Sequence, residues 1–472
     1  MRGTRLCFMS AHLAAHEGEE YYKARNTSLV QILSEAKVGP KPQILDSTFY
    51  GHHSFVCGDL NYRVKLPGIQ NEDPLKTDNE DEDTELEDEE SKKELKKKQH
   101  ELHVKRVLEL IEKKDWKTLN DGDELSIGLK KKECLAGFQT PYCNFSPTFK
   151  LLREPGFKYN VQRTPSYTDR ILWKSLDGLG KNLKNLTYHP CPGYITSDHK
   201  PIRGAFEIMP INMRSLTEQN SKDPTGQSFT IFVSEIKCRE LVMSKSGDPY
   251  VSFMSNPPEL LVKKEIKGSS VQEKPVTKGS WPKTKTIKSN LNPDWGDSEV
   301  QLALASTYDK PSKLAGAFLY VSVYDDDHGS DDLVGTVEVN LMDLAGSDNT
   351  DKTKAKVFHI KDRPITKYGR VRGILSCKIT VRWSDRNILL ETSKSAVSNK
   401  EVKGNNNNKS NVASSDKSKE RSGATSHSNE KTMSATDSKA ENVAKDINQV
   451  NSDKESGNKK GTKKGKKKCV VM

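Results

Sequence analysis

Three regions with different residue patterns follow one another along the chain, and they rule out one fold with a single core. Residues 1–210 alternate apolar, strand-like runs with charged, helix-like stretches. Residues 226–385 are β-branched and aromatic runs separated by turn residues, and residues 386–472 are mainly Ser, Asn, Lys and Asp. Because 472 residues exceed the usual size of one domain, we expect two folded regions and a tail.

Residues 1–210 are predicted to form an α/β region. Strand-like runs stand at 6–9, 54–57 and 170–173, and apolar residues recur at helical spacing within 102–116. Such alternation is typical of an α/β core. A block of charge at about 70–100, acidic and then basic, cannot be buried. We interpret this block as a solvated insertion or an exposed helix, with a regulatory acidic loop as the alternative.

The remaining residues are predicted to form an all-β sandwich and a disordered tail. Short β-branched runs with turns between them are typical of an antiparallel sandwich. Residues 386–472 have too few apolar side chains to bury, and only 33% of the whole chain is hydrophobic. The eight cysteines lack zinc-type spacing, and the opening residues lack the apolar stretch of a signal peptide. These features favour an intracellular chain with reduced thiols.

The motif FVCGDLNYR carries residue types that phosphoryl hydrolysis needs. It places Asp59 and Asn61 two residues apart at the expected end of a strand, so both side chains point the same way. The carboxylate is suited to take a proton from water, and the amide is suited to donate to a phosphate oxygen.

Two later motifs add a histidine and its partners. SDHKP holds Asp198 next to His199, and PSYTDRIL holds Asp169 next to Arg170. Asp169 is suited to hold a histidine in one tautomer, and Arg170 is suited either to a structural ion pair or to phosphate. Taken singly, each motif is as typical of a turn or a surface as of a catalytic site.

Together, and in this order, the three motifs resemble the signatures of the inositol polyphosphate 5-phosphatases. The opening CFMSAHLAAH is similar to that family's NSHLAAH segment. Within the family, GDLNYRVKLPG and KYNVQRTPSYTDRILWKS are most similar to the Src-homology-containing inositol phosphatases. The resemblance implies that residues 1–210 are the C-terminal part of a four-layer endonuclease/exonuclease/phosphatase sandwich.

The resemblance also implies a role for each matching residue. Asp59 would activate water and Asn61 would steady the phosphoryl group. His199, paired with Asp169, would bind and stabilise the scissile phosphate, and His12 would contact another phosphate oxygen.

Substrate and metal contacts are implied in the same way. Lys150, in PTFK, matches a lysine that contacts a ring phosphate, and Arg170 is a second substrate-binding candidate. Asp198 would lie in the outer coordination sphere of a catalytic Mg²⁺. Val161 stands where some family members carry a basic residue, so the match does not define the substrate preference.

The principal Mg²⁺ ligands of the family, an Asn and a Glu, precede the segment that CFMSAHLAAH matches. The sequence therefore lacks roughly the first half of the phosphatase region as the family has it. Two interpretations follow: an incomplete product of a longer protein, which we favour because the catalytic residues are mostly intact, or a truncated form without activity.

Residues 226–385 resemble a C2 domain, through SGDPYV, TKTIKSNLNPDW and VSVYDDDHGSDDLVG. Calcium needs oxygen ligands gathered from several loops. The carboxylates at matching positions are Asp248, Asp325, Asp327 and Asp332. The first acidic residue of the motif is absent, so a Ca²⁺ site and a sandwich that merely carries acidic loops both stay open. Lys283, Lys285 and Lys288 form either a basic face for anionic lipid or a solvated strand face.

The carboxyl end carries the most specific short motif. Cys469, Val470, Val471 and Met472 form a CaaX box of the type that is farnesylated. Seven lysines stand within 459–468, so most of the net charge of +11 belongs to the tail. One lipid chain binds a membrane only marginally, and the lysines supply the second signal. A nuclear-localisation reading of the lysines alone ranks below the CaaX reading.

The sequence therefore predicts a phosphatase that is anchored to a membrane and hydrolyses the 5-phosphate of phosphoinositides or inositol polyphosphates with Mg²⁺. Expected partners are the substrate, an anionic membrane and a prenyltransferase, at the cytoplasmic face of the plasma membrane. The alternative is a catalytically inactive, prenylated C2 protein that binds lipid. A nuclease is the third interpretation, disfavoured by PSYTDRIL and the lipid anchor, so no nucleic-acid partner is expected.

Overall fold

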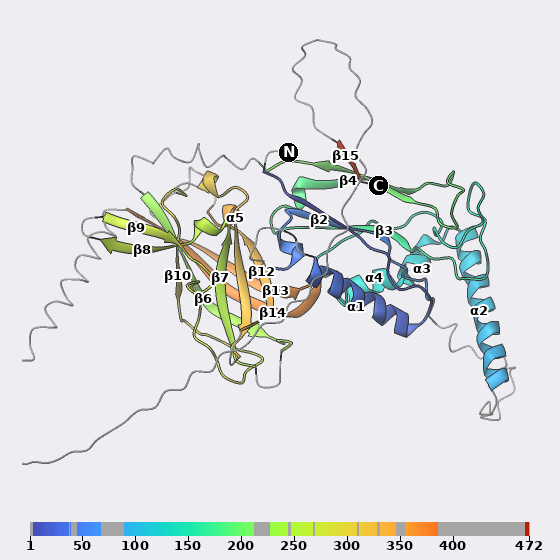
Figure 1. The fold of residues 1–472 in the computed structure, drawn as a ribbon, viewed down its shortest axis with the longest axis horizontal. Coiled ribbons are helices and arrows are strands. Elements are labelled where there is room, and N and C mark those ends of the chain that lie inside the picture. Colours follow the sequence, from blue (N-terminus) through green and yellow to red (C-terminus); the bar gives the residue numbers. More distant parts are fainter. Residues whose placement is uncertain are drawn as a thin grey trace, which may run out of the picture. The chain divides into compact units, whose positions relative to one another are not determined.

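The structure is a computed structural model (Figure 1). It describes residues 3–36, 38, 45–67, 89–211, 227–243, 247–267, 270–308, 311–327, 331–345, 355–385 and 468–471. By its contacts the chain divides into two units, and the second, Thr392–Gly465, lies wholly outside the described residues. The elements belong to the first unit, Met1–Glu391 with Lys466–Met472.

Two small sheets form the framework of residues 1–210. In the first, β1 (Leu6–Ser10) runs parallel to β2 (His53–Asp59), which pairs antiparallel with β3 (Asp169–Ser175). In the second, β5 (Ile202–Ile208) lies between β4 (Leu183–Pro190) and β15 (Lys468–Val471). The three predicted strand runs fall within β1, β2 and β3, so the α/β prediction is confirmed.

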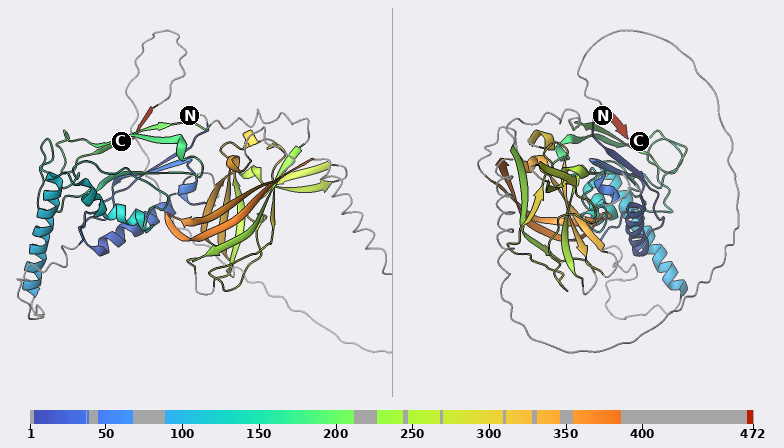
Figure 2. Two further views of the ribbon diagram at one scale, coloured as in Figure 1. Left: turned by 180° about the vertical axis from the view of Figure 1, so that it is seen from behind. Right: turned by 60° about the vertical axis from the view of Figure 1, so that its left-hand side comes forward.

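The two sheets pack against each other through aromatic side chains. Phe206 of β5 meets Phe55 of β2 and Trp173 of β3 edge-on, with ring centroids 5.2 and 5.0 Å apart. Helix α1 (Glu19–Glu35) covers the opposite face of the first sheet, where its Leu29 and Leu33 join Val56 and other buried residues. Figures 1 and 2 show the same order of layers from opposite sides: second sheet, first sheet, helices.

Between β2 and β3 the described residues form three further α-helices. They are α2 (Glu89–Glu112), α3 (Trp116–Asp121) and α4 (Glu124–Lys130). α2 confirms the helical spacing seen in the sequence, because its Val104, Val107 and Leu110 are buried. Residues 70–88 of the charged block lie outside the described residues, and its end, 89–100, is the first half of α2, where most lysines and glutamates are exposed.

Residues 227–385 form the predicted all-β sandwich. Seven strands are hydrogen-bonded in the order β10-β6-β14-β13-β12-β11-β7, and β8 pairs with β9. Their bounds are β6 (Gln227–Arg239), β7 (Pro249–Asn256), β8 (Val262–Lys267), β9 (Ser270–Pro275), β10 (Val300–Ala303), β11 (Phe318–Asp325), β12 (Asp332–Asn340), β13 (Lys356–Lys367) and β14 (Arg370–Asp385), with helix α5 (Leu341–Ala345) after β12. One apolar core fills this sandwich, built from alternate residues of the strands.

The prediction that TKTIKSNLNPDW forms a strand is wrong. Residues 283–295 form two isolated bridges and no strand: Lys283, just before this segment, bridges to Ser252 of β7, and Asp294 bridges to Lys237 of β6. The N–H of Val251 donates to the Thr284 hydroxyl rather than to a backbone carbonyl (2.9 Å), and Pro282 has no N–H to donate. A regular ladder therefore cannot form here.

The tail is described only at its end. Residues 386–467 lie outside the described residues, so the expected disorder stays a prediction, and Lys468–Val471 form β15 with Cys469 opposite Phe206 of β5. None of the helices in the described ranges is long and apolar enough to cross a lipid bilayer.

Candidate active site

The site forms where β2 ends beside the beginning of β3. The antiparallel register places Asp59 directly opposite Asp169. The segment after β1 continues along β2, because Ala11 N–H donates to the Cys57 carbonyl (2.9 Å) and Leu13 N–H to the Asp59 carbonyl (3.0 Å). Gly58 permits this close approach: at its φ of 130° a Cβ atom would lie 2.1 Å from the Ala11 carbonyl oxygen. The glycine before Asp59 thus brings His12 over the strand end.

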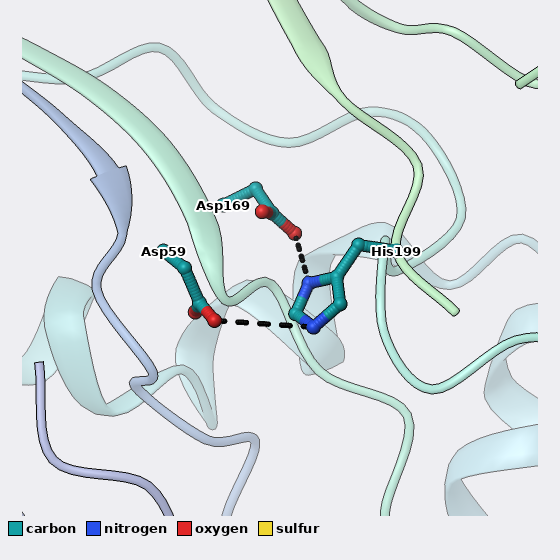
Figure 3. Close-up of side chains that lie close together, drawn as sticks. All are labelled: Asp59, Asp169 and His199. Atoms are coloured by element: carbon teal, nitrogen blue, oxygen red, sulfur yellow. Dashed lines mark hydrogen bonds and ion pairs between the residues drawn. The ribbon is translucent and has the colours of Figure 1, made fainter. Parts of the chain in front are cut away.

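His199 links the two aspartates (Figure 3). Its Nδ1 lies 3.0 Å from Asp169 Oδ2, and its Nε2 lies 3.8 Å from Asp59 Oδ2. The hydroxyls of Thr148 and Thr168 also donate to Asp169 Oδ2, at 2.8 and 3.0 Å. A carboxylate that accepts at Nδ1 fixes the ring and its tautomer, leaving Nε2 directed toward Asp59.

The surroundings shift the pKa values of Asp59 and His199 upward. Burial and the negative charge of Asp169 raise the pKa of Asp59, against smaller lowering effects of His199, His12 and the Asn61 N–H. Burial lowers the pKa of His199, but the hydrogen bond and charge of Asp169, with the charges of Asp59 and Asp198, outweigh it, so the pKa lies above its ordinary value. Such a pair suits a carboxylate base beside a cationic imidazole.

Of two more predicted residues, His12 contacts the Asp59 carboxylate through its side chain, and Asn61 contacts it only through its backbone N–H (3.1 Å). His12 Nε2 lies 3.4 Å from Asp59 Oδ2, and its side chain is 75% exposed, so it stands at the mouth of the site. Asn61 is buried instead: its Nδ2 donates to the Leu13 carbonyl (3.0 Å), and its Oδ1 accepts from Arg63 (2.6 Å). The role of Asn61 at a phosphoryl group stays a prediction.

Lys150 and Asp198 form the polar side of the site next to His199. Lys150 Nζ lies 3.9 Å from Asp198 Oδ2, and both side chains are about one-third exposed or less, at 28% and 35%. The Leu151 N–H donates to the Asp198 carbonyl (2.9 Å), which joins the two segments. An accessible ammonium beside the histidine suits a phosphate of the substrate.

The structure contradicts the prediction that Arg170 binds substrate. Its side chain is 1% exposed and pairs with the fully buried Asp123, whose Oδ2 lies 2.7 Å from its Nη1. Arg170 alternates with Asp169 along β3, so it points to the opposite face of the sheet and into the core. Of the two roles that the sequence left open, the structure supports the ion pair.

Several residues at the site had no assigned role in the sequence analysis. Thr148 and Thr168 hold Asp169, and the Phe149 ring lies against the His199 ring, with centroids 4.6 Å apart. The Arg63 guanidinium also lies over the Phe149 ring, at 4.8 Å from the ring centroid. The threonines flank Lys150 and Asp169 in the motifs, and this proximity was the available signal.

Among the residues that the structure describes, one set of acidic, histidine or cysteine side chains converges closely enough to hold a metal: Asp59, Asp169 and His199, with ligand atoms within 4.8 Å. Mg²⁺ prefers an octahedron of oxygen ligands. Here one donor is an imidazole, and Asp169 Oδ2 already accepts from Thr148, Thr168 and His199. These residues do not fit Mg²⁺ as a set.

The acidic loops of the sandwich are occupied by donors of the chain itself. Asp248 Oδ2 lies 2.7 Å from Lys288 Nζ, and its Oδ1 accepts from the Ser289 N–H (2.8 Å). Asp325 accepts from the Asp248 N–H at 2.7 Å. The predicted Ca²⁺ ligands Asp327 and Asp332 lie near, and nearby negative charge, first that of Asp325, raises the pKa of Asp327. Calcium at these loops stays a prediction.

Comparison with known protein families finds a match for each of the two folded regions. Residues 1–104 and 99–205 match the Endonuclease/Exonuclease/phosphatase family 2, and residues 230–355 match the C2 domain. The mouse type II inositol 1,4,5-trisphosphate 5-phosphatase is 29% identical over 215 residues, which cover 44% of this chain and 17% of that protein. The Xenopus laevis phosphatidylinositol 3,4,5-trisphosphate 5-phosphatase 1 is 25% identical over 275 residues, covering 55% and 23%.

One solved structure is also similar in part. The inositol polyphosphate 5-phosphatase domain of SPsynaptojanin, in complex with inositol (1,4)-bisphosphate and a calcium ion, is 22% identical, covers 43% of this chain and 46% of that chain, and has a TM-score of 0.30. The chain spans less than a quarter of the length of the two curated relatives. One region of the chain thus matches the endonuclease/exonuclease/phosphatase family 2, a second region matches the C2 domain, and the two curated relatives are inositol polyphosphate 5-phosphatases.

Proposed function

We propose that this chain hydrolyses the 5-phosphate of phosphoinositides or soluble inositol polyphosphates. Asp59 takes a proton from the attacking water, and the His199 imidazolium donates from Nε2 to the scissile phosphate. The observation that carries the proposal is the placement of His199, with Nδ1 3.0 Å from Asp169 and Nε2 3.8 Å from Asp59. At this separation Nε2 and the Asp59 carboxylate can act on the same reacting phosphate group, one as a proton donor and the other as a base for water.

The substrate class rests on the relatives. One is named for inositol 1,4,5-trisphosphate and the other for phosphatidylinositol 3,4,5-trisphosphate, and both are named 5-phosphatases. The shared chemistry is a phosphate ester on an inositol ring that carries other phosphates. Lys150 and His12 are accessible to solvent and carry nitrogen donors, so they suit those other phosphate oxygens.

Mg²⁺ dependence is part of the proposal. It follows from the family resemblance, while the described residues lack a fitting ligand set. Phosphate release should be measured from inositol trisphosphate, phosphatidylinositol trisphosphate and single-stranded DNA, with Mg²⁺ and with a chelator. We expect phosphate release from the two inositol compounds when Mg²⁺ is present and no release when the chelator is present. Vesicle binding without release supports the alternative of an inactive lipid-binding protein, and cleavage of DNA alone contradicts both.

We further propose that the protein works at the cytoplasmic face of the plasma membrane. Cys469 would carry a farnesyl group, and the adjacent lysines would bind anionic lipid. In the C2 domain, the exposed Lys283, whose Nζ lies 4.4 Å from the Tyr250 ring centroid, and Lys285 support the same surface. Metabolic labelling with a farnesyl analogue, lost in Cys469→Ser, tests the anchor.

The pH dependence of hydrolysis follows from the two shifted groups. Asp59 must be deprotonated and His199 protonated, so activity should rise above the raised pKa of Asp59 and fall above the raised pKa of His199. Asp169→Asn removes a negative charge that raises both pKa values. Both limbs of the profile of kcat/KM should therefore move to lower pH, and unmoved limbs would contradict the assignment.

Calcium should have little effect on the C2 domain as long as Lys288 is present. Its ammonium already neutralises Asp248, so a divalent ion must displace it. We expect CaCl₂ to raise the thermal midpoint of Lys288→Met more than that of the wild-type protein, with Lys285→Met as the matched control. An equal, large rise in all three proteins would show that the lysine does not compete with calcium.

A further inference from the structure

The hairpin between β13 and β14 sets two cations directly opposite each other. Its turn has two residues, Tyr368 and Gly369, with φ values of 52° and 72°. Positive φ values at both positions are what a two-residue turn needs to match the right-handed twist of the two strands. The register therefore pairs Lys367 with Arg370. Side chains of directly paired residues stand on the same face of a sheet, and like charges in such a pair are destabilising.

A third cation stands beside this pair. The register passes from Thr366 opposite Val371 to Ile365 opposite Gly373, so Arg372 is the extra residue of a bulge. Its backbone carbonyl accepts from the Val242 N–H (2.9 Å), which fixes the bulge against the loop after β6. Three cations thus stand next to the turn of one hairpin. We call Lys367, Arg370 and Arg372 the hairpin cation cluster.

Little negative charge compensates the hairpin cation cluster. Lys367 Nζ donates to the Leu333 carbonyl (2.6 Å), and Asp46 and Asp332 act on it through space without an ion pair within the described residues. The Nε atoms of Arg370 and Arg372 are buried without a hydrogen-bond partner. Burial, and then the positive charge of Arg370, lower the pKa of Arg372.

Other arginines of the sandwich are compensated. Arg239 lies 3.0 Å from Asp362, and Arg363 lies 3.1 Å from Asp177. The described part of the chain gives Arg370 and Arg372 no such carboxylate. A cluster of like charge that the fold does not neutralise departs from the usual arrangement, and such departures concentrate at functional sites.

The hairpin is also held in place, so it cannot open to relieve the repulsion. The Gly369 carbonyl accepts from the Ala136 N–H (2.8 Å), and the Tyr368 N–H donates to Asp46 (2.7 Å). A Cβ atom on Gly369 would lie 3.0 Å from Leu33, which shows how closely the turn is packed. A site fixed before binding loses less entropy when the ligand arrives.

We propose that the hairpin cation cluster binds a multiply phosphorylated anion, such as an inositol polyphosphate, either free or as a lipid headgroup. Guanidinium groups donate paired hydrogen bonds to phosphate oxygens, and several phosphates on one ring match several cations. The cluster belongs to β13 and β14 and contains none of the active-site residues. The proposal does not depend on hydrolysis.

The test measures binding of inositol hexakisphosphate to the full chain by isothermal titration calorimetry, at low and at physiological salt. Arg370→Gln/Arg372→Gln should weaken the cluster's affinity by about tenfold to a hundredfold, because it removes charge-assisted hydrogen bonds. The matched control, Lys356→Gln/Lys361→Gln, removes the same charge from the same hairpin and should bind like the wild-type protein. Lys150→Gln reports binding at the active site separately.

The outcomes separate this site from the active site. Binding that the double arginine variant loses and Lys150→Gln retains supports the cluster. Binding lost only in Lys150→Gln, or equal in the arginine and control variants, overturns the proposal, and so does a wild-type protein that does not bind. Co-sedimentation with vesicles containing phosphatidylinositol bisphosphate, against vesicles of equal charge made with phosphatidylserine, then distinguishes the lipid headgroup from the free inositol phosphate. A phosphatase assay on the same variants shows independently whether the proposed hydrolysis fails.

Discussion

Asp59→Asn is expected to abolish most phosphate release while leaving the protein folded. The substitution keeps the shape of the side chain but removes the base, and loss of a general base costs about 10²- to 10⁴-fold in rate. Both His12 and His199 approach the same oxygen of Asp59, at 3.4 and 3.8 Å. The loss should appear in kcat with little change in KM, because the carboxylate acts on water rather than on the ring phosphates.

A surface aspartate supplies the control for Asp59→Asn. Asp121 is 52% exposed at the end of α3, where it pairs with Lys117. Asp121→Asn changes the net charge by the same amount and should keep wild-type activity. Thermal midpoints of both variants should match the wild-type value within a few degrees. Activity of Asp59→Asn within tenfold of the control would remove Asp59 from the mechanism.

Arg170→Met is expected to be the most destabilising single change at the motifs. It leaves the buried Asp123 without its cation, and breaking a buried pair in this way costs about 3–5 kcal/mol of unfolding free energy. Asp123 cannot leave the core, because the same Oδ2 also caps α4 through the Ser126 N–H (3.0 Å) and hydroxyl (2.7 Å). Urea unfolding followed by tryptophan fluorescence measures the change.

A second variant separates the charge effect from lost packing. Asp123→Ser/Arg170→Met removes both charges and retains a residue that caps helices well. This double variant should be more stable than Arg170→Met alone, because no uncompensated charge stays buried. Lys117→Met, which breaks an exposed pair, should leave stability unchanged. If Arg170→Met unfolds like the wild-type protein, the buried pair contributes nothing measurable.

The sequence predicted those parts of the site that depend on local pattern. Short apolar runs predict the strands that hold the two aspartates, and in the structure Asp59 ends β2 and Asp169 begins β3. The meeting of Asp59, Asp169 and His199 came from the order of three motifs and their resemblance to a family, since no spacing along the chain places residue 199 beside residue 59. The structure adds the register that sets the two aspartates opposite each other.

What the sequence could not predict depends on distant partners. Arg170 stands next to Asp169 in a motif, yet its role follows from Asp123, 47 residues earlier and without a signal of its own. The lysine that pairs with Asp248, Lys288, is 40 residues away. It lies in a segment whose sequence resembles a strand, but there the Val251 N–H donates to the Thr284 hydroxyl and not to a backbone carbonyl. The opposition of Lys367 and Arg370 requires the hairpin register.

The central claim, that water attacks a 5-phosphate at Asp59 and His199, is tested most directly by the identity of the product. The protein should be incubated with inositol 1,4,5-trisphosphate and Mg²⁺ in isotopically labelled water, and the products analysed by mass spectrometry and phosphorus NMR. The proposal predicts inositol 1,4-bisphosphate with the label in the released phosphate, and neither product from Asp59→Asn. Loss of the 1- or 4-phosphate, or no release by the wild-type chain, would contradict it.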